Sequence, residues 1–297
     1  DWDKMEEVWR YMFMNELKVA PEDHPVLMSF HLSNMTNNVN TLATFFESFN
    51  VPAMYIGVQS LFSLYGSGRT SGLIVDVGDG VTSTVPFYEG EYLKHAKNRV
   101  DLGGRDVTTY LANLIKFRGA HLDNVTELEV ARMIKETNCF VAADYQEELK
   151  KIEESSVHEL THILPDGQAI TLNEERFKAP EIFFNPALNG MECEGVQDNT
   201  FSAIRRSAID VRKTLFENII LVGGSTLTQG FATRLEHEIV LKAPANMKVN
   251  VVLPEERHHL QWIGMSIYAS LNGLNNRGTW LSRDDYDEYG PDALVDE

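Results

Sequence analysis

Two glycine-containing segments have the residue types that could hold a phosphate group and a metal ion. The first reads Asp-Val-Gly-Asp-Gly at residues 76–80 and follows an apolar run at residues 72–75. Glycine lets backbone N–H groups approach an anion, and a carboxylate at the end of a strand can hold hydrated Mg²⁺. An ordinary Asp-Gly hairpin turn would use the same residues, so this segment alone leaves both interpretations open.

The second segment, Gly-Gly-Ser-Thr at residues 223–226, lies between an apolar run at residues 219–222 and a helical pattern that contains Phe231, Leu235 and Ile239. A strand, a glycine pair and the start of a helix form an order of elements that suits phosphate binding. With two such loops in one chain, the phosphate-plus-metal interpretation is favoured. We expect both loops to direct their N–H groups toward one polyphosphate.

A third pattern, His-Glu-Leu-Thr-His at residues 158–162, has the spacing of a zinc metalloprotease helix. The Pro-Asp-Gly sequence at residues 165–167 would end such a helix three residues later. We therefore interpret the segment as a surface strand of a hairpin that returns at residues 168–172, and we predict no zinc site. The residues expected to share one face of this strand are His158, Leu160, His162 and Leu164.

The composition is that of an acidic globular protein. In 297 residues, 26 Lys and Arg against 44 Asp and Glu give a formal net charge of −18. This charge repels nucleic acid and anionic lipid, so we expect no direct binding to either. Cys139 and Cys193 lack disulfide or zinc spacing and fit a reducing compartment. The longest apolar runs are about four residues, far short of a membrane span, and a soluble protein is expected.

The elements that must position these segments alternate between short apolar runs and helical patterns, which is typical of an α/β protein. We predict a hairpin over residues 72–89, a strand at residues 249–253 and an apolar helix at residues 261–271. A capping box at Thr126 and Glu129 begins another helix. Its apolar positions are Val130, Met133, Ile134, Thr137 and Val141, and its opposite face carries Arg132, Lys135 and Glu136.

Taken together, the motifs resemble actin and the actin-related proteins across essentially the whole chain. The segments that carry the resemblance are residues 50–55, 64–70, 76–82, 88–90, 101–106, 223–227 and 262–264. Residues 180–195, 214–216 and 223–227 lean toward centractin-like relatives, whereas residues 50–70 look like conventional actin. The subtype therefore stays open between the two.

The resemblance implies an actin/Hsp70-type ATP-binding fold, in which two lobes close on a nucleotide cleft. The outer lobe would comprise residues 1–66 and 260–297. The inner lobe would comprise a core at residues 67–102 and 192–259 and a peripheral subdomain at residues 103–191. The family's first phosphate loop and small outer subdomain would lie upstream of Asp1, so we expect that an amino-terminal part is missing.

The resemblance also implies roles for individual residues, with ATP or ADP and Mg²⁺ as cofactors. Asp76 would hold the metal through water, and Gln59 would orient the attacking water, which makes these two the catalytic candidates. The implied nucleotide-binding residues are Gly78, Asp79, Gly80, Val81, Gly104, Arg132, Lys135, Glu136, Gly223, Gly224, Leu227, Thr228 and His258. Lys135 and Glu136 could also be plain surface charges.

The chain departs from the family's pattern at several of these positions. Ser83 stands where actin usually has a His that positions water, and Val77 stands where a hydroxyl is usual, so we expect slow hydrolysis. Thr228 and His258 replace a larger aromatic residue and a Lys beside the adenine, which relaxes nucleotide selectivity. Asn189 lies in actin's apolar plug between filament strands, where an amide would cost about 1 to 3 kcal/mol to desolvate.

Two functions follow as hypotheses. The first is an ATP-binding cytoskeletal subunit of a filament or defined assembly. Its expected location is the cytoplasm, with a nuclear location left open. Its expected partners are actin-family subunits or actin-binding proteins. The second is a non-polymerising scaffold subunit of a chromatin, dynactin or axonemal complex, which the altered plug, Ser83 and the acidic carboxyl-terminal tail support. Glu91 and Lys94 also put charge into a loop that in actin is mostly apolar and serves longitudinal contacts, which makes self-assembly the least secure expectation. A chaperone-like or sugar-kinase-like activity lacks any recognisable acceptor site.

Overall fold

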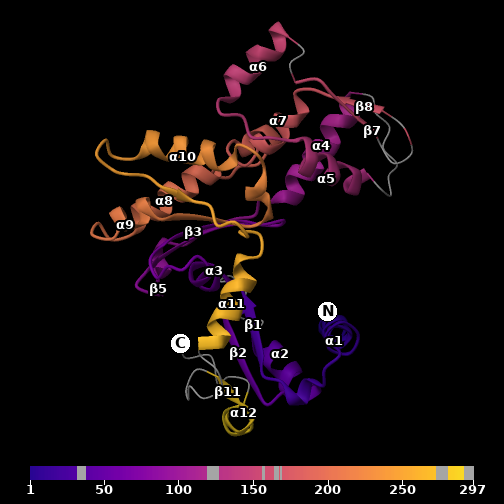
Figure 1. Cartoon of the computed structure of the whole chain (residues 1–297), viewed down its shortest axis with the longest axis vertical. Coiled ribbons are helices and arrows are strands. Elements are labelled where there is room, and N and C mark those ends of the chain that lie inside the picture. Colours follow the sequence, from indigo (N-terminus) through magenta and orange to yellow (C-terminus); the bar gives the residue numbers. More distant parts are fainter. Residues whose placement is uncertain are drawn as a thin grey trace. The chain divides into compact units, whose positions relative to one another are not determined.

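The computed structural model describes residues 1–31, 38–118, 127–155, 158–163, 167, 169–271 and 280–290. The chain divides into two compact units. Residues 1–66 with residues 261–297 form the first unit, and residues 67–260 form the second (Figure 1). Both units combine helices with sheets, which confirms the predicted α/β class.

The first unit is built on a three-stranded sheet with the strand order β1-β2-β11. Strand β1 pairs with β2 in parallel, and β11 pairs with β2 in antiparallel. The elements of this unit are α1 (Trp2–Tyr11), η1 (Met12–Leu17), η2 (Pro21–Asp23), β1 (Val26–Phe30), α2 (Asn38–Ala43), η4 (Thr44–Ser48), β2 (Ala53–Val58), α3 (Gln59–Gly66), α11 (Leu260–Leu271), β11 (Leu281–Ser282) and α12 (Arg283–Tyr289).

The core of the first unit is aromatic. The ring centroids of Trp9 and Phe45 lie 4.8 Å apart, and those of Phe13 and Phe49 lie 5.6 Å apart. The predicted apolar helix is present as α11, and Gly264 within it has a packing reason. A Cβ at residue 264 would lie only 1.8 Å from the carbonyl oxygen of Phe62, so glycine lets α11 approach α3 closely.

The second unit contains a larger sheet with the order β10-β9-β3-β4-β5, in which β6 also pairs with β4. Strands β10, β9 and β3 are parallel to one another, and β4 runs antiparallel to β3. The strands are β3 (Gly72–Val77), β4 (Thr82–Tyr88), β5 (Glu91–Tyr92), β6 (Asn98–Val100), β9 (Ile219–Val222) and β10 (Val251–Val252), and a separate hairpin pairs β7 (Leu160–Ile163) with β8 (Ala169–Leu172).

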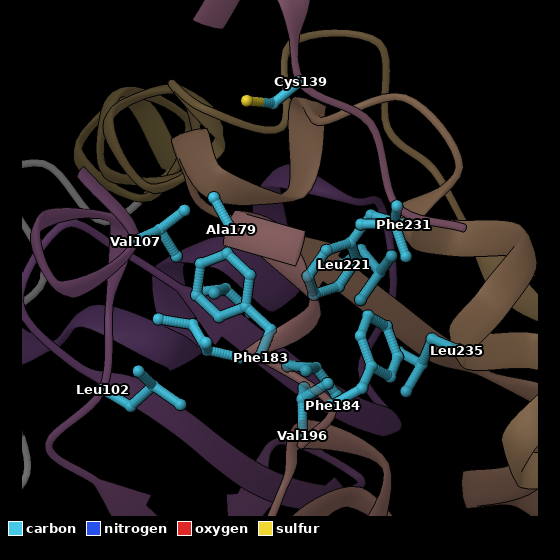
Figure 2. Close-up of a cluster of buried hydrophobic side chains, with 14 of the residues drawn as sticks. Leu102, Val107, Cys139, Ala179, Phe183, Phe184, Val196, Leu221, Phe231 and Leu235 are labelled. Atoms are coloured by element: carbon cyan, nitrogen blue, oxygen red, sulfur yellow. The ribbon is translucent and has the colours of Figure 1, made fainter. Parts of the chain in front are cut away.

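Helices cover this sheet and enclose one continuous apolar core. Helix α8 packs against β4 and α10, whereas α4, α5 and α7 pack together as a second group (Figure 1). Figure 2 shows the rings of Phe183, Phe184 and Phe231 beside Leu221 and Leu235 at the centre of the core. The remaining elements are η5 (Lys94–Ala96), α4 (Gly104–Phe117), α5 (Glu127–Asn138), α6 (Tyr145–Glu154), α7 (Glu175–Glu181), η6 (Pro186–Asn189), α8 (Val196–Arg206), α9 (Arg212–Glu217), η7 (Gly224–Leu227) and α10 (Phe231–Lys242).

Two predicted elements are longer than the observed ones. The strand predicted at residues 249–253 spans only residues 251–252, because the N–H of Asn250 donates to the carbonyl of Phe216, outside the strand ladder. The helix predicted to reach Val141 ends at Asn138, because the N–H of Val141 donates to the carbonyl of Gln229 in another segment. The predicted capping residue Thr126 lies outside the described residues.

Candidate phosphate and metal site

The predicted hairpin at residues 72–89 is confirmed, and its turn leaves backbone donors exposed. Val77 pairs with Thr82, and the N–H of Gly78 donates to the carbonyl of Val81 at 3.0 Å. Among the described residues, the N–H groups of Asp79, Gly80 and Val81 have no hydrogen-bond acceptor. Consecutive N–H groups without acceptors form a concave site that suits an anion.

The Gly-Gly-Ser-Thr loop leads from β9 into η7, and glycine is required at its start. Gly223 has φ +94°, and a Cβ there would lie 2.3 Å from the carbonyl oxygen of Val77 and 2.7 Å from Oδ1 of Asp76. Any other residue would clash with the end of β3 and strain the backbone. Within the described part of the chain, the N–H groups of Gly224 and Ser225 also lack acceptors. The second loop therefore offers two further donors.

Asp76 is the acidic group beside these donors. It lies near the end of β3, half-buried, opposite Ser83 on β4 and next to Gly223. In the described ranges, its carboxylate accepts no hydrogen bond and forms no ion pair. Burial raises the pKa of Asp76 to about 6. A bound cation would favour the ionised form, and Mg²⁺ prefers carboxylate oxygens, so this side chain fits a metal held directly or through water.

Direct contacts join the two loops to the start of α4. The hydroxyl of Ser225 and the N–H of Gly104 both donate to the carbonyl of Gly78, each at 2.9 Å. Lys135, on α5, donates from Nζ to the carbonyl of Gly104 at 2.9 Å. Burial is the main cause that lowers the pKa of Lys135. Four separate segments thus meet around Gly78, with the positive end of α4 directed at the turn.

Two residues at this site were not predicted to take part. Arg105 donates from Nη2 and Nε to Oδ2 of Asp79, at 2.8 and 3.1 Å, and its N–H donates to the carbonyl of Asp79 at 2.8 Å. Ser225 makes the hydroxyl contact described above. Both lie inside motifs that carry the family resemblance, but a motif does not show which side chain turns toward a loop more than 20 residues away in the sequence.

The other residues predicted on α5 face solvent. Arg132 is exposed and pairs with Glu129 and Glu136 on its own helix, at 3.0 Å to Oε1 of Glu136. It makes no contact with the glycine turns among the described residues. Arg132 and Glu136 therefore lie on the predicted common face, and of the three residues there, Lys135 is the one with a contact to the start of α4 in the described part of the chain.

The remaining predicted residues surround η7 or lie in the first unit. Leu227 is 46% exposed, and the N–H of Thr228 donates to the carbonyl of Ser225. The ring of His258 lies 3.9 Å from that of His259, centroid to centroid. Arg257, which precedes His258, supports the glycine loop. Its backbone carbonyl accepts from the N–H of Gly223, and its guanidinium donates to the hydroxyl of Thr226. Gln59 begins α3 in the first unit, and its role stays a prediction.

The His-Glu-Leu-Thr-His segment forms the predicted hairpin, but its two histidines do not share a strand face. His158 precedes β7 and packs against the rings of Phe140 and Phe177, with Nε2 2.6 Å from Oε1 of Glu148. His162 lies within β7, opposite Ile170. The interpretation of both as surface strand residues is wrong for His158, because it lies in a turn before β7 and the aromatic contacts leave its side chain only 14% exposed. Leu164 lies outside the described residues.

The comparison with known families agrees with the observed arrangement. The family model described as Actin matches residues 1–297. Among the described residues, no three His, Cys, Asp or Glu side chains gather into a cluster that could hold a metal ion with side chains alone. In the same part of the chain, no helix has both the length and the apolar character needed to cross a bilayer.

Proposed function

The chain belongs to the actin family and has its ATP-binding type of fold, and from this premise we propose that it is a cytoskeletal subunit that binds Mg-ATP or Mg-ADP. One observation carries the proposal. In the described residues, five backbone N–H groups without acceptors belong to two loops joined at Gly78, and the start of the second loop contacts the carboxylate of Asp76, which has no ion pair. Phosphate needs such donors, and its Mg²⁺ needs such a carboxylate.

Under this proposal, each group of residues in the site contacts a different part of the nucleotide or its metal ion. The turn at residues 78–81 and the loop at residues 223–225 donate to phosphate oxygens, and Asp76 holds hydrated Mg²⁺. Asp79 and Gly104 lie at the ribose. The adenosine pocket is lined by Arg132, Lys135, Glu136, Gly224, Leu227, Thr228 and His258. The bound Mg²⁺ supplies charge neutralisation on the phosphates, which a protein this acidic needs.

We propose that hydrolysis is slow. Ser83 is buried directly opposite Asp76, so the position beside the metal carboxylate carries a hydroxyl, which is a poor general base at neutral pH. Val77, which is buried on β3 beside Asp76, offers no hydroxyl to the phosphate. Gln59 is left as the group that orients water. General acid-base assistance contributes about 10² to 10⁴ in rate, and that is the size of the loss we expect relative to a site that has it.

A second candidate function is a scaffold subunit that does not polymerise. The observation that favours it is the polar character of three residues in two segments that serve assembly in actin. Asn189 is half-buried in η6, and Glu91 and Lys94 are exposed on the chain that follows β4. Under this candidate, nucleotide stabilises the fold and partners come from a larger complex. For both candidates we propose cytoskeletal or cytoplasmic surroundings, with actin-family subunits or actin-binding proteins as partners.

The test begins with the purified full-length protein. Mass spectrometry identifies any nucleotide that copurifies, and titration with a fluorescent ATP analogue, with and without Mg²⁺, measures affinity. We expect Mg²⁺-dependent binding in the wild type and at least about tenfold weaker binding in Asp76→Asn, because a cation-holding carboxylate is lost. No bound nucleotide and no Mg²⁺-dependent binding would refute the proposal.

Pelleting separates the two candidates. The protein is sedimented after addition of salt and Mg²⁺, while phosphate release is followed in the same sample. Polymer with slow phosphate release supports the filament subunit, whereas nucleotide binding without polymer supports the scaffold. Asn189→Ile serves as the matched variant, since restoring an aliphatic side chain should promote pelleting if desolvation of the amide is what prevents it.

A further inference from the structure

A group of cations on the second unit includes none of the residues proposed to bind nucleotide. Its members, which we call the basic patch, are Lys94, Lys97, Arg205, Arg206 and Lys213, and all five are exposed. They come from η5, the residue before β6, the last turn of α8 and α9. In a chain with a net charge of −18, such a gathering of one sign requires an explanation.

Contacts between backbone segments hold the basic patch together. The guanidinium of Arg206 donates to Oδ1 of Asn98 at 2.6 Å, which joins the end of α8 to β6. Arg212 donates from Nη2 to the carbonyl of Arg205 at 2.6 Å, which joins α9 to α8. Helix α8 also packs against η5, and α8 and α9 are neighbours along the chain (Figure 1). Segments about 100 residues apart in sequence therefore share one surface.

The five cations have no carboxylate partners among the described residues. Several other cations of the unit are paired, as Lys242 is with Asp198 at 2.8 Å. The neighbouring Arg99 shows the contrast, since it pairs with Asp101 at 2.8 Å. Carboxylates outnumber Lys and Arg side chains in this chain, so the lack of ion pairs in the patch does not come from a shortage of carboxylates. The positive charges of an unpaired cluster repel one another, and an anionic partner would relieve that repulsion.

Helix capping does not account for the whole cluster. Arg205 and Arg206 do lie in the last turn of α8, where cations favour the negative end of the helix. Lys97 and Lys213 have no such position, and Lys94 lies only in the single 3-10 turn of η5. Ile209, in the segment between α8 and α9, has a side chain that is 80% exposed. An exposed apolar side chain on a segment flanked by Arg205, Arg206 and Lys213 suits a partner that offers both an aliphatic group and acidic groups.

We propose that the basic patch with Ile209 binds an acidic segment of a partner protein, one that presents Asp or Glu side chains around an aliphatic residue. The exposed acids Asp210 and Glu91 border the patch and limit its positive charge. With the chain's net charge of −18, this makes a long polyphosphate such as nucleic acid or an anionic membrane a poorer match than a short acidic segment. The surface is separate from the nucleotide site, so the proposal does not depend on nucleotide turnover.

Fluorescence anisotropy with a short labelled peptide rich in Glu and containing one Leu tests the proposal, under conditions in which the protein does not pellet. We expect binding that weakens as salt is raised from about 0.05 M to about 0.3 M. The double variant Lys94→Glu with Lys97→Glu should weaken it about tenfold or more, since it reverses two charges that face the peptide. If the double variant unfolds, Lys213→Glu gives an independent check of the charge effect. Ile209→Ser tests the apolar contact, and it should weaken binding of the peptide that contains Leu more than binding of a Leu-free version.

The matched control is Lys18→Glu with Lys150→Glu, two exposed lysines outside the patch. It makes the same change in net charge and should leave the affinity within about twofold. Equal loss in the control, or no binding by the wild type, would overturn the proposal. So would tighter, patch-dependent binding of single-stranded DNA or phosphatidylserine vesicles, or patch-dependent dimerisation in sedimentation velocity. Nucleotide affinity should be unchanged in the patch variants, which distinguishes this test from that of the proposed function.

Discussion

At the scale of single residues, Asp76 is the group on which the proposed nucleotide site depends most. Its carboxylate lies near the end of a buried strand without a hydrogen bond or an ion pair in the described residues. Burial raises its pKa from 3.8 to about 6. Ionisation of this group therefore costs more in the folded protein than in the unfolded chain, and a cation removes that cost when it binds.

The pH dependence of stability follows with a defined sign. Because the folded pKa of Asp76 is the higher one, its contribution is favourable below about pH 4 and is lost as pH rises through 6. Without divalent cations, Asp76→Asn should be more stable than the wild type at pH 7.5, by about 1 to 3 kcal/mol, and nearly equal to it at pH 4. Urea unfolding of both proteins across this range measures the difference. Parallel pH profiles would contradict the prediction.

At the scale of helices and strands, one buried guanidinium connects three parts of the second unit. Arg234 on α10 donates to both carboxylate oxygens of Glu181 on α7, at 3.0 and 3.1 Å, and to the carbonyl of Ala142 at 2.9 Å. It also pairs with Glu238 and lies 4.9 Å from the ring centroid of Phe184. Since Glu181 is buried, its charge depends on this partner.

Removal of Arg234 should therefore cost more than a surface ion pair would. Arg234→Met leaves Glu181 buried and unpaired, and we expect a loss of about 3 to 5 kcal/mol in the free energy of unfolding. The double variant with Glu181→Leu should recover much of that loss, because both charges are replaced by apolar groups. Chemical denaturation of the two single variants and the double variant gives the coupling energy. Additive losses would show that the pair is not coupled.

At the scale of the whole molecule, the net charge of −18 is the dominant electrostatic property. Like charges at this density repel one another, and folding brings them closer together. The same charge makes Mg²⁺ a necessary companion for a bound polyphosphate. It also makes the basic patch distinct, because that patch is a local reversal of the overall sign.

Salt should therefore stabilise the protein. Raising NaCl from about 0.02 M to about 0.2 M shortens the Debye length, and we expect a rise in Tm of about 2 to 4 °C, which corresponds to about 1 kcal/mol. Differential scanning calorimetry without nucleotide measures the shift. The more acidic variant Lys18→Glu with Lys150→Glu should show a steeper rise. A Tm that falls with salt would mean that favourable ion pairs outweigh the repulsion.

Local sequence determined the parts of this protein that depend on a few adjacent residues. The hairpin around Gly78 was predictable because glycine and an Asp-Gly turn set the local backbone conformation. The strand, glycine pair and helix around Gly223 followed in the same way. The return strand after the histidine segment was predictable from its Pro-Asp-Gly turn. The order of the motifs along the chain also indicated the family, because several motifs typical of actin occur in the same chain.

Only the tertiary structure decided which distant groups meet. The contact of Ser225 with Gly78, the contact of Lys135 with Gly104, and the basic patch all join segments far apart in sequence. The burial of His158 between aromatic rings and the early ends of the strand at residue 252 and the helix at residue 138 have the same origin. These features depend on hydrogen bonds and packing between elements, and local residue patterns do not contain that information.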